Sequence, residues 1–238
     1  MKVAVLALAA LALTGCESTQ SKSAKLESVA QRSKHEKGLV ISEQAKEIKV
    51  EGTTMLQDAN GAATVVELRN ESKGSLVGLP VSVQVLDKAS KPLYANDAPG
   101  LDSSLVSVAS LGPGAELAWV NDQVTIATPG QSVVAKIGAG AKPGPAQLPQ
   151  MELTGLKAEA DASGEQAITG DVANRSQVEQ RRLVVYVTGR KGDKVVAAGR
   201  AIVERLAPGK SAHFSVFPIG DPNGAELSAA APPTVVAP

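Results

Sequence analysis

The alternation of apolar and polar residues along the chain predicts β-strands. In one stretch Leu79, Val81, Val83 and Val85 alternate with Pro80, Ser82, Gln84 and Leu86. In a second stretch Leu183, Val185 and Val187 alternate with Val184, Tyr186 and Thr188. Because successive side chains of a strand point to opposite faces, this period indicates strands with at least one buried face.

Two long stretches of the chain carry the same signals in the same order. DANGAATVVELRNES from Asp58 and DASGEQAITGDVANRS from Asp161 each place a turn-forming cluster before a β-branched run that ends in Asn-x-Ser. Polar turns follow at 87–91 and 190–194, and Leu-x-Pro-Gly follows at 111–114 and 206–209. An aromatic residue lies five positions after each Gly, as Trp119 and Phe214. Pro-Gly fits a type II turn. Because the same signals recur in the same order, we infer a tandem duplication of one β-unit.

The two copies differ in length. The stretch from Asn70 to Leu111 is longer than the equivalent stretch from Asn174 to Leu206, and residues 94–102 predict a loop-like insertion there. Loops on a rigid scaffold often carry function. An enlarged loop without evident chemistry is, however, more often a tolerated variation.

Breaks in the hydrophobic pattern divide the chain. Gly and Pro recur in GAGAKPGPAQLPQ, and the segment that begins ESTQSKSAKLES at Glu17 is polar without a continuous apolar stripe. Such compositions are typical of linkers and tethers. The predicted parts are a signal peptide (1–15), a polar tether (16–37), a β-sandwich domain (38–137), a Gly/Pro linker (138–150), a second β-sandwich domain (151–227) and a disordered tail (228–238).

The order of these motifs resembles the FxLYD family of bacterial extracytoplasmic domains, over roughly residues 60–121 and 166–216. Val83-Gln84-Val85-Leu86-Asp87 is similar to the V-x-L-Y-D strand end, with Leu86 in place of the tyrosine. Val187-Thr188-Gly189 departs from it at the aspartate. The resemblance implies an all-β fold of two tandem immunoglobulin-like β-sandwich domains after a signal peptide and polar tether. It says little about activity, because such sandwiches carry unrelated functions.

The sole cysteine, Cys16, follows a short apolar run. A disulfide within the chain needs a second cysteine, and a thiolate nucleophile needs a base that this segment lacks. After Met1-Lys2, the apolar residues 3–13 are too few for a spanning helix, which needs roughly 20. A charged start, a short apolar core and small residues before a cleavage point predict an export signal.

Leu13-Thr14-Gly15-Cys16 resembles the bacterial lipobox. The resemblance implies diacylglyceryl transfer to the Cys16 sulfur and cleavage before Cys16 by signal peptidase II. Two acyl chains give stable anchoring, so we expect an extracytoplasmic protein attached to membrane lipid through Cys16. Glu17, in place of an aspartate, favours the outer membrane over the inner membrane of a Gram-negative cell. The alternative is an ordinary signal peptide with an incidental cysteine.

Composition narrows the class of partner. The formal net charge is zero and no long basic run occurs, which argues against nucleic-acid binding. Aromatic residues make up only 2% of the chain, which argues against a surface that stacks bases or sugars. The core must therefore consist of Val, Leu, Ile and Ala.

No residue pattern predicts catalysis, a metal site or a cofactor. His35 lies in the tether, and His213 is expected to be half-exposed on a strand, without a nucleophile elbow elsewhere. We interpret six aspartates as turn formers and the two Asn-x-Ser triplets as strand-end turns. These aspartates are Asp58, Asp97, Asp102, Asp161, Asp193 and Asp221.

Two functions remain open, and an enzyme is the third and least favoured hypothesis. The first is a noncatalytic envelope lipoprotein whose tandem modules contact an envelope protein or act as a spacer, because open sandwiches have edge strands that can pair with a partner. The second is a solute-binding lipoprotein that uses the interdomain cleft. The second is weaker, since a flexible linker does not preorganise a cleft and few aromatic residues can line one.

Overall fold

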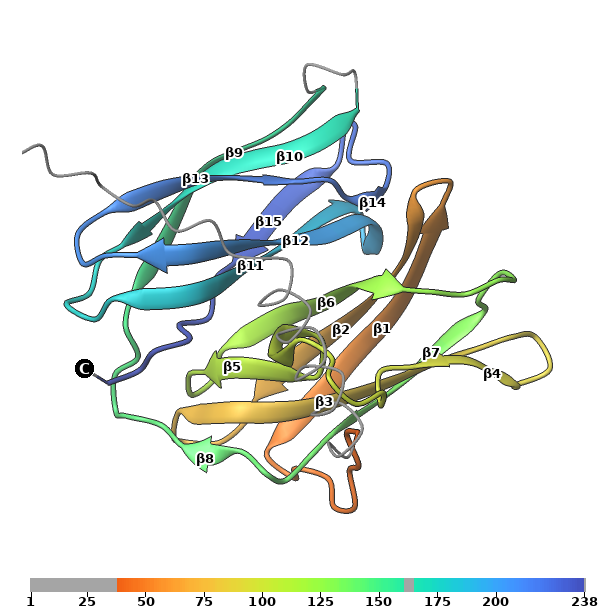
Figure 1. The fold of residues 1–238 in the computed structure, drawn as a ribbon, viewed down its shortest axis with the longest axis horizontal. Coiled ribbons are helices and arrows are strands. Elements are labelled where there is room, and N and C mark those ends of the chain that lie inside the picture. Colours follow the sequence, from red (N-terminus) through yellow and green to blue (C-terminus); the bar gives the residue numbers. More distant parts are fainter. Residues whose placement is uncertain (1–37, 161–164, 238) are drawn as a thin grey trace, which may run out of the picture. The chain divides into compact units, whose positions relative to one another are not determined.

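A computed structural model describes residues 38–160 and 165–237 (Figure 1). The predicted signal peptide, lipobox and tether lie outside the described residues. Within these ranges the chain consists of antiparallel strands and one 3-10 helix, η1 (Ser103–Leu105), with no α-helix. The all-β prediction is confirmed.

The first half forms a β-sandwich of two antiparallel sheets. One sheet has the order β1-β2-β6, and in the other β3 pairs with β4, β5, β7 and β8. These strands are β1 (Ile48–Asp58), β2 (Gly61–Asn70), β3 (Leu76–Leu86), β4 (Pro92–Ala95), β5 (Ser107–Leu111), β6 (Glu116–Val124), β7 (Ser132–Ile137) and β8 (Lys142–Pro143). The strand predicted over 79–86 lies within β3, and its alternating residues Leu79, Val81, Val83 and Val85 are fully buried.

The second half repeats this arrangement. Its sheets have the orders β13-β10-β9 and β14-β12-β11-β15. Its strands are β9 (Met151–Ala160), β10 (Gln166–Asn174), β11 (Gln180–Lys191), β12 (Lys194–Leu206), β13 (Ser211–Val216), β14 (Ile219–Gly220) and β15 (Glu226–Ala230). The strand predicted over 183–188 lies within β11.

Equivalent hydrogen bonds occur in the two halves, as expected for the duplication inferred from the sequence. Asn70 and Asn174 are completely buried at the ends of β2 and β10. The Asn70 side chain donates to the Leu111 carbonyl (3.1 Å), and the Asn174 side chain donates to the Leu206 carbonyl (3.1 Å). Each Asn Oδ1 also accepts the backbone amide two residues later. The Asn-x-Ser triplets are therefore strand-end turns, as predicted.

The insertion lies between β4 and β5. Residues 94–95 belong to β4, so the connecting loop begins at Asn96. Asp102 caps η1 by accepting the Ser104 amide. Trp119 Nε1 donates to the Ser104 carbonyl (3.1 Å), which fixes η1 against β6.

Two predicted boundaries are wrong. The linker predicted from residue 138 contains β8, which pairs with β3, and the Gly144 amide donates to the Ser75 carbonyl (2.7 Å). The tail predicted from residue 228 is ordered, because β15 pairs with β11 and includes Ser228. The amides of Thr234 and Val235 donate to the buried Gln180 side chain. Backbone groups in both segments find partners far away in the sequence, which composition alone does not reveal.

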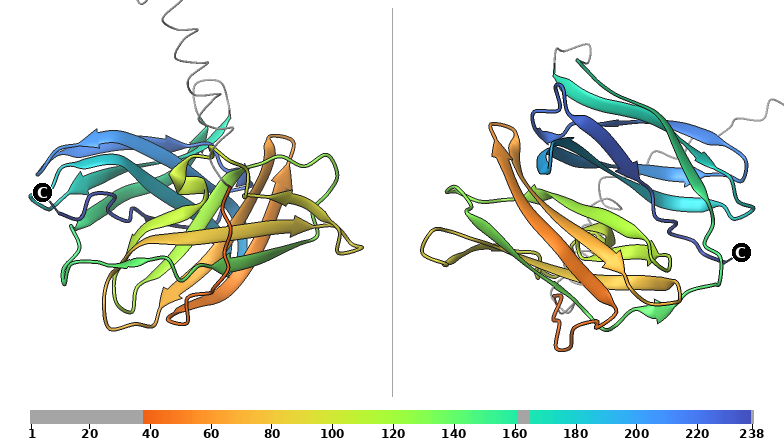
Figure 2. Two further views of the ribbon diagram at one scale, coloured as in Figure 1. Left: turned by 60° about the horizontal axis from the view of Figure 1, so that its bottom comes forward. Right: turned by 180° about the vertical axis from the view of Figure 1, so that it is seen from behind.

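The apolar core of the first sandwich extends onto one sheet of the second sandwich, which has a separate core of its own. Strand β11 is buried on both faces: Leu183 and Val185 pack inside the second sandwich, whereas Val184 and Tyr186 pack with Val65 and Val120 of the first. The described chain accordingly forms one compact unit. Figure 2 shows the C-terminal segment, in dark blue, continuing from β15 toward the first sandwich, where the Ser110 hydroxyl of β5 donates to the Pro233 carbonyl (2.7 Å).

Candidate functional site

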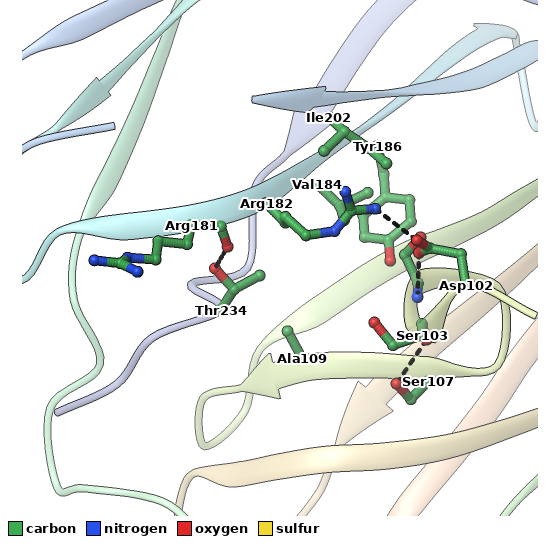
Figure 3. Close-up of a pocket in the computed structure, with 11 residues that line it drawn as sticks. Asp102, Ser103, Ser107, Ala109, Arg181, Arg182, Val184, Tyr186, Ile202 and Thr234 are labelled. Carbon is green, nitrogen blue, oxygen red and sulfur yellow. Dashed lines mark hydrogen bonds and ion pairs between the residues drawn. The ribbon is translucent and has the colours of Figure 1, made fainter. Parts of the chain in front are cut away.

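A pocket of about 270 Å³ lies where the two sandwiches meet, and we call it the junction pocket (Figure 3). Helix η1 supplies Ser103 and strand β5 supplies Ser107. Strands β11 and β12 supply Val184 and Ile202, and the C-terminal segment supplies Thr234. Hydroxyl and apolar groups therefore meet at one place, although they come from three distant parts of the chain.

Arg182 lies in the wall of the junction pocket together with Arg181 and Asp102. Its Nη2 donates to Asp102 Oδ2 (2.6 Å), and its Nη1 donates more weakly to Glu204 Oε1 (3.2 Å). Its φ angle of 48° places it in the left-handed region, which costs about 1 kcal/mol for a residue with a Cβ. Such strain persists only where the surrounding structure holds the residue. Here β11 pairs with β12 on both sides of Arg182, at Arg181 and Leu183.

A second arginine crosses the junction deeper in the protein. The Arg200 side chain is only 4% exposed, and its Nε donates to Asp122 Oδ1 (2.8 Å). Its backbone amide donates to Asp122 Oδ2 (3.1 Å), and its guanidinium donates to the Ser104 hydroxyl. Ser104 in turn donates to Asp102. These contacts form one polar chain from Asp122 to Arg182 across the two halves.

A third ion pair joins the same sheets. Arg190 of β11 pairs with Glu67 of β2. It lines a separate hollow of about 430 Å³, and Tyr186 lines both this hollow and the junction pocket. Tyr186 thus borders both spaces at the junction.

The electrostatic environment keeps Asp102 ionised. Burial acts to raise the pKa of Asp102, but hydrogen bonds from the Ser104 hydroxyl and amide, together with the Arg182 charge, outweigh it and lower the pKa. Burial raises the pKa of the Tyr186 hydroxyl, which therefore stays neutral. The pocket wall accordingly holds a compensated ion pair beside neutral hydroxyl groups.

The residues singled out from the sequence do not lie at the junction pocket, apart from one aspartate. Cys16, Leu13, Thr14, Gly15 and His35 lie outside the described residues. His213 lies on β13 as predicted, but it is exposed, and its Nδ1 is 3.2 Å from Asp171 Oδ1. Asp58 and Asp221 accept amides two residues later, which confirms them as turn formers.

Asp102 has a role that sequence reasoning missed. It caps a turn as predicted, but its other oxygen pairs with Arg182 of the second sandwich. Arg182, Arg200 and Asp122 were missed as well. Two signals were available: an arginine inside the apolar run VVAAGRAIV, and apolar residues at both the odd and the even positions of 183–187, which favours burial of both faces.

The described residues contain no group of three or more His, Cys, Asp or Glu side chains placed to hold a metal ion. Over the same ranges, no helix has the length and apolar character needed to cross a membrane.

No protein family model matches the chain, and no curated protein matches it. Among solved structures, it has a distant similarity to two complexes of variants of Amycolatopsis orientalis exo-chitosanase CsxA with PNP-beta-D-glucosamine. The first has a TM-score of 0.27 and 12% identity over 76% of this chain and 25% of the chitosanase chain. The second has a TM-score of 0.26 and 12% identity over 74% and 25%. The chain thus spans about a quarter of the length of these structures, and its function must be argued from its own residues.

Proposed function

We propose that this protein is a noncatalytic bacterial envelope lipoprotein, anchored by acyl chains on Cys16, whose two sandwiches serve protein interaction or structural spacing. The observation that carries the proposal is Leu13-Thr14-Gly15-Cys16 directly behind a short apolar segment. Each buried CH₂ of an acyl chain contributes roughly 0.8 kcal/mol, so two chains hold a folded domain at the bilayer.

The chemistry of the described residues supports a noncatalytic role. Three polar side chains of the junction pocket are engaged with protein groups: Asp102 with Arg182, and Ser104 with Asp102 and Arg200. A general base or nucleophile needs a side chain free to reach a substrate. The partner of the sandwiches is expected to be another envelope protein rather than a nucleic acid, because the chain has no net positive charge.

The junction pocket favours a second candidate, which is solute binding. The flexible linker expected from the sequence would leave the cleft unformed, but the ion pairs of Arg182 and Arg200 hold its two sides together. A preformed pocket lined by both hydroxyl and apolar groups is typical of small-molecule sites. A small molecule that copurifies with the protein would support this candidate, whereas a specific crosslinked envelope protein would support the first.

The anchor is tested by Cys16→Ser in the full chain. The variant should remove lipid labelling and leave uncut precursor, because no sulfur remains to be acylated. Mass spectrometry of the mature N-terminus checks both the cleavage point and the acyl groups. As a matched control, Ser18→Ala changes a neighbouring residue outside the four lipobox positions and should mature normally. Normal maturation of Cys16→Ser would refute the proposed anchor.

A further inference from the structure

Phe217 is the most exposed aromatic side chain of the described residues. It is 55% exposed, whereas Trp119, Phe214 and Tyr186 are at most 4% exposed. It follows β13 and lines a hollow of about 550 Å³. The exposed Phe217 ring therefore offers an apolar contact inside a hollow.

The hollow continues into a second one of about 430 Å³, with which it shares Asn60 and Asp122, and we call the two together the Phe217 groove. The groove is held in shape by the protein itself. Asp58 Oδ2 accepts the Gly220 amide (2.7 Å), which ties the β1–β2 turn to β14. Gly220 has a φ of 96°, and a Cβ there would lie 2.1 Å from the Val196 carbonyl oxygen. A preformed groove lowers the entropic cost of binding.

The charge of the Phe217 groove determines what kind of segment fits it. Its walls include the carboxylates of Asp58, Asp122, Glu165 and Asp221, and Lys, Arg and His are absent from the described residues that line the two hollows. Arg200 compensates Asp122, and Lys191 lies 3.4 Å from Asp221. Asp58 faces no cation among the described residues, since it accepts only the amides of Asn60 and Gly220. Asp58 therefore gives the groove a carboxylate that no cation of the described residues compensates.

A lysine or arginine side chain matches both properties of this surface. Its alkyl stem can lie on the Phe217 ring while its cation meets the ring face and the neighbouring carboxylates. Anions such as nucleic acid or phospholipid headgroups are repelled by the same carboxylates. Pro218 and Pro222 beside Phe217 have no amide donor, so recognition by side chains is favoured over strand addition.

We propose that the Phe217 groove binds a lysine- or arginine-bearing segment of a partner protein. This inference rests on the proposed role in protein interaction and names the surface that performs it.

The test uses the full chain in detergent micelles and a short fluorescein-labelled peptide of alternating lysine and alanine, capped at both ends. Fluorescence anisotropy should show saturable binding that weakens with added salt, because the attraction is partly electrostatic. The matched peptide with glutamate in place of lysine should not bind. Equal binding of the two peptides, or no binding of the lysine peptide, would overturn the proposal.

Three variants test the surface itself. Phe217→Ser should weaken binding of the lysine peptide by roughly 5- to 10-fold, because the apolar contact and the cation–π attraction are lost. Phe217→Tyr retains the ring and should bind like the unchanged protein, which separates loss of the ring from loss of the fold. Val134→Ser removes a 41% exposed apolar side chain on β7, outside the groove, and should have no effect. Unchanged binding by Phe217→Ser would overturn the assignment.

Two further outcomes separate related explanations. If spermidine displaces the peptide with the peptide's own affinity, the occupant is a small polycation and not a protein segment. Cys16→Ser alters anchoring but leaves the groove intact, so peptide binding by that variant shows that this inference can stand or fail independently of the lipid anchor.

Discussion

In the second sandwich, β12 runs without interruption from Lys194 to Leu206, whereas the first sandwich covers the equivalent path with β4, the loop, η1 and β5. Strand β12 and the segment around η1 contact each other at the junction. The Ser104 hydroxyl of η1 accepts a hydrogen bond from the Arg200 guanidinium of β12, and the Asp102 carboxylate accepts one from the Arg182 guanidinium of β11. The insertion is therefore not a free loop, because it supplies one side of the interface between the two copies.

The strand-end turns show the opposite behaviour, because they are the same in both halves. Asn70 and Asn174 each close a turn around the following Ser and accept a backbone amide two residues later. The Pro-Gly hairpin of each half also hydrogen-bonds to this asparagine. The Gly114 amide donates to the Asn70 carbonyl and the Gly209 amide donates to the Asn174 carbonyl, each at 2.9 Å. We conclude that duplication preserved the internal turns, while divergence between the copies produced the contacts that join them.

The largest expected effect comes from Arg200→Ala, which would break the buried contact between the halves. It leaves the Asp122 carboxylate, 19% exposed, without its cation, so the free energy of unfolding should fall by about 3–5 kcal/mol. Urea denaturation measures this change. Arg205→Ala on the same strand is a matched control, because Arg205 is 73% exposed and its loss should cost at most about 1 kcal/mol.

A double variant refines this prediction. Arg200→Met with Asp122→Leu removes both charges and should recover much of the lost stability, because neither charge is then buried alone. If Arg200→Ala and Arg205→Ala unfold at the same urea concentration, the ion pair does not hold the junction.

A smaller effect is expected from the turn asparagines, and it tests how similar the two halves are. Asn70→Ala leaves the carbonyls of Gly74, Leu111 and Gly112 without their side-chain donor, so it should cost about 2–4 kcal/mol. Asn174→Ala should cost less, because its side chain donates to the carbonyls of Val178 and Leu206 only. Urea denaturation again gives both values.

Ser72→Ala is the matched control for Asn70→Ala. Its hydroxyl lies in the same turn but is exposed, so its removal should cost less than about 1 kcal/mol. The equivalence of the two turns would be rejected if Asn174→Ala left the stability unchanged while Asn70→Ala reduced it.

The smallest effect concerns acid. The pKa of Asp102 in the folded protein lies below its ordinary value of 3.8, so the stability that Asp102 contributes is present above that pH. It is lost as the pH falls below 3.8 through the lowered pKa, because the folded state must then take up a proton at a cost. Asp102→Asn should therefore flatten the acid limb of the stability curve by less than about 1 kcal/mol, measured by urea denaturation at several pH values. Identical acid limbs for the two proteins would contradict this prediction.

Much of the fold, but little of the candidate site, could be predicted from the sequence. The alternation at Leu79–Val85, the Asn-x-Ser turns and the start of the second sandwich at Met151 were all readable from neighbouring residues. The end of the first sandwich and the C-terminal segment were not, because Gly/Pro-rich and Ala/Pro-rich compositions are also typical of loose chain. Lys142–Pro143 nevertheless pairs with β3, and Thr234 with Gln180.

The sequence by itself determined the strand periods, the positions of the turns and the repetition of one unit, because these depend on residues that are close together in the chain. The tertiary structure decided which charges meet. Asp122 and Arg200 are 78 residues apart in sequence, and Asp102 and Arg182 are 80 residues apart. Arg200 is buried opposite a carboxylate of the first sandwich, whereas Arg182 stays half-exposed although it pairs with another. The reason is physical: a strand's period shows which face a side chain lies on, whereas the energy of a charge depends on what packs against that face.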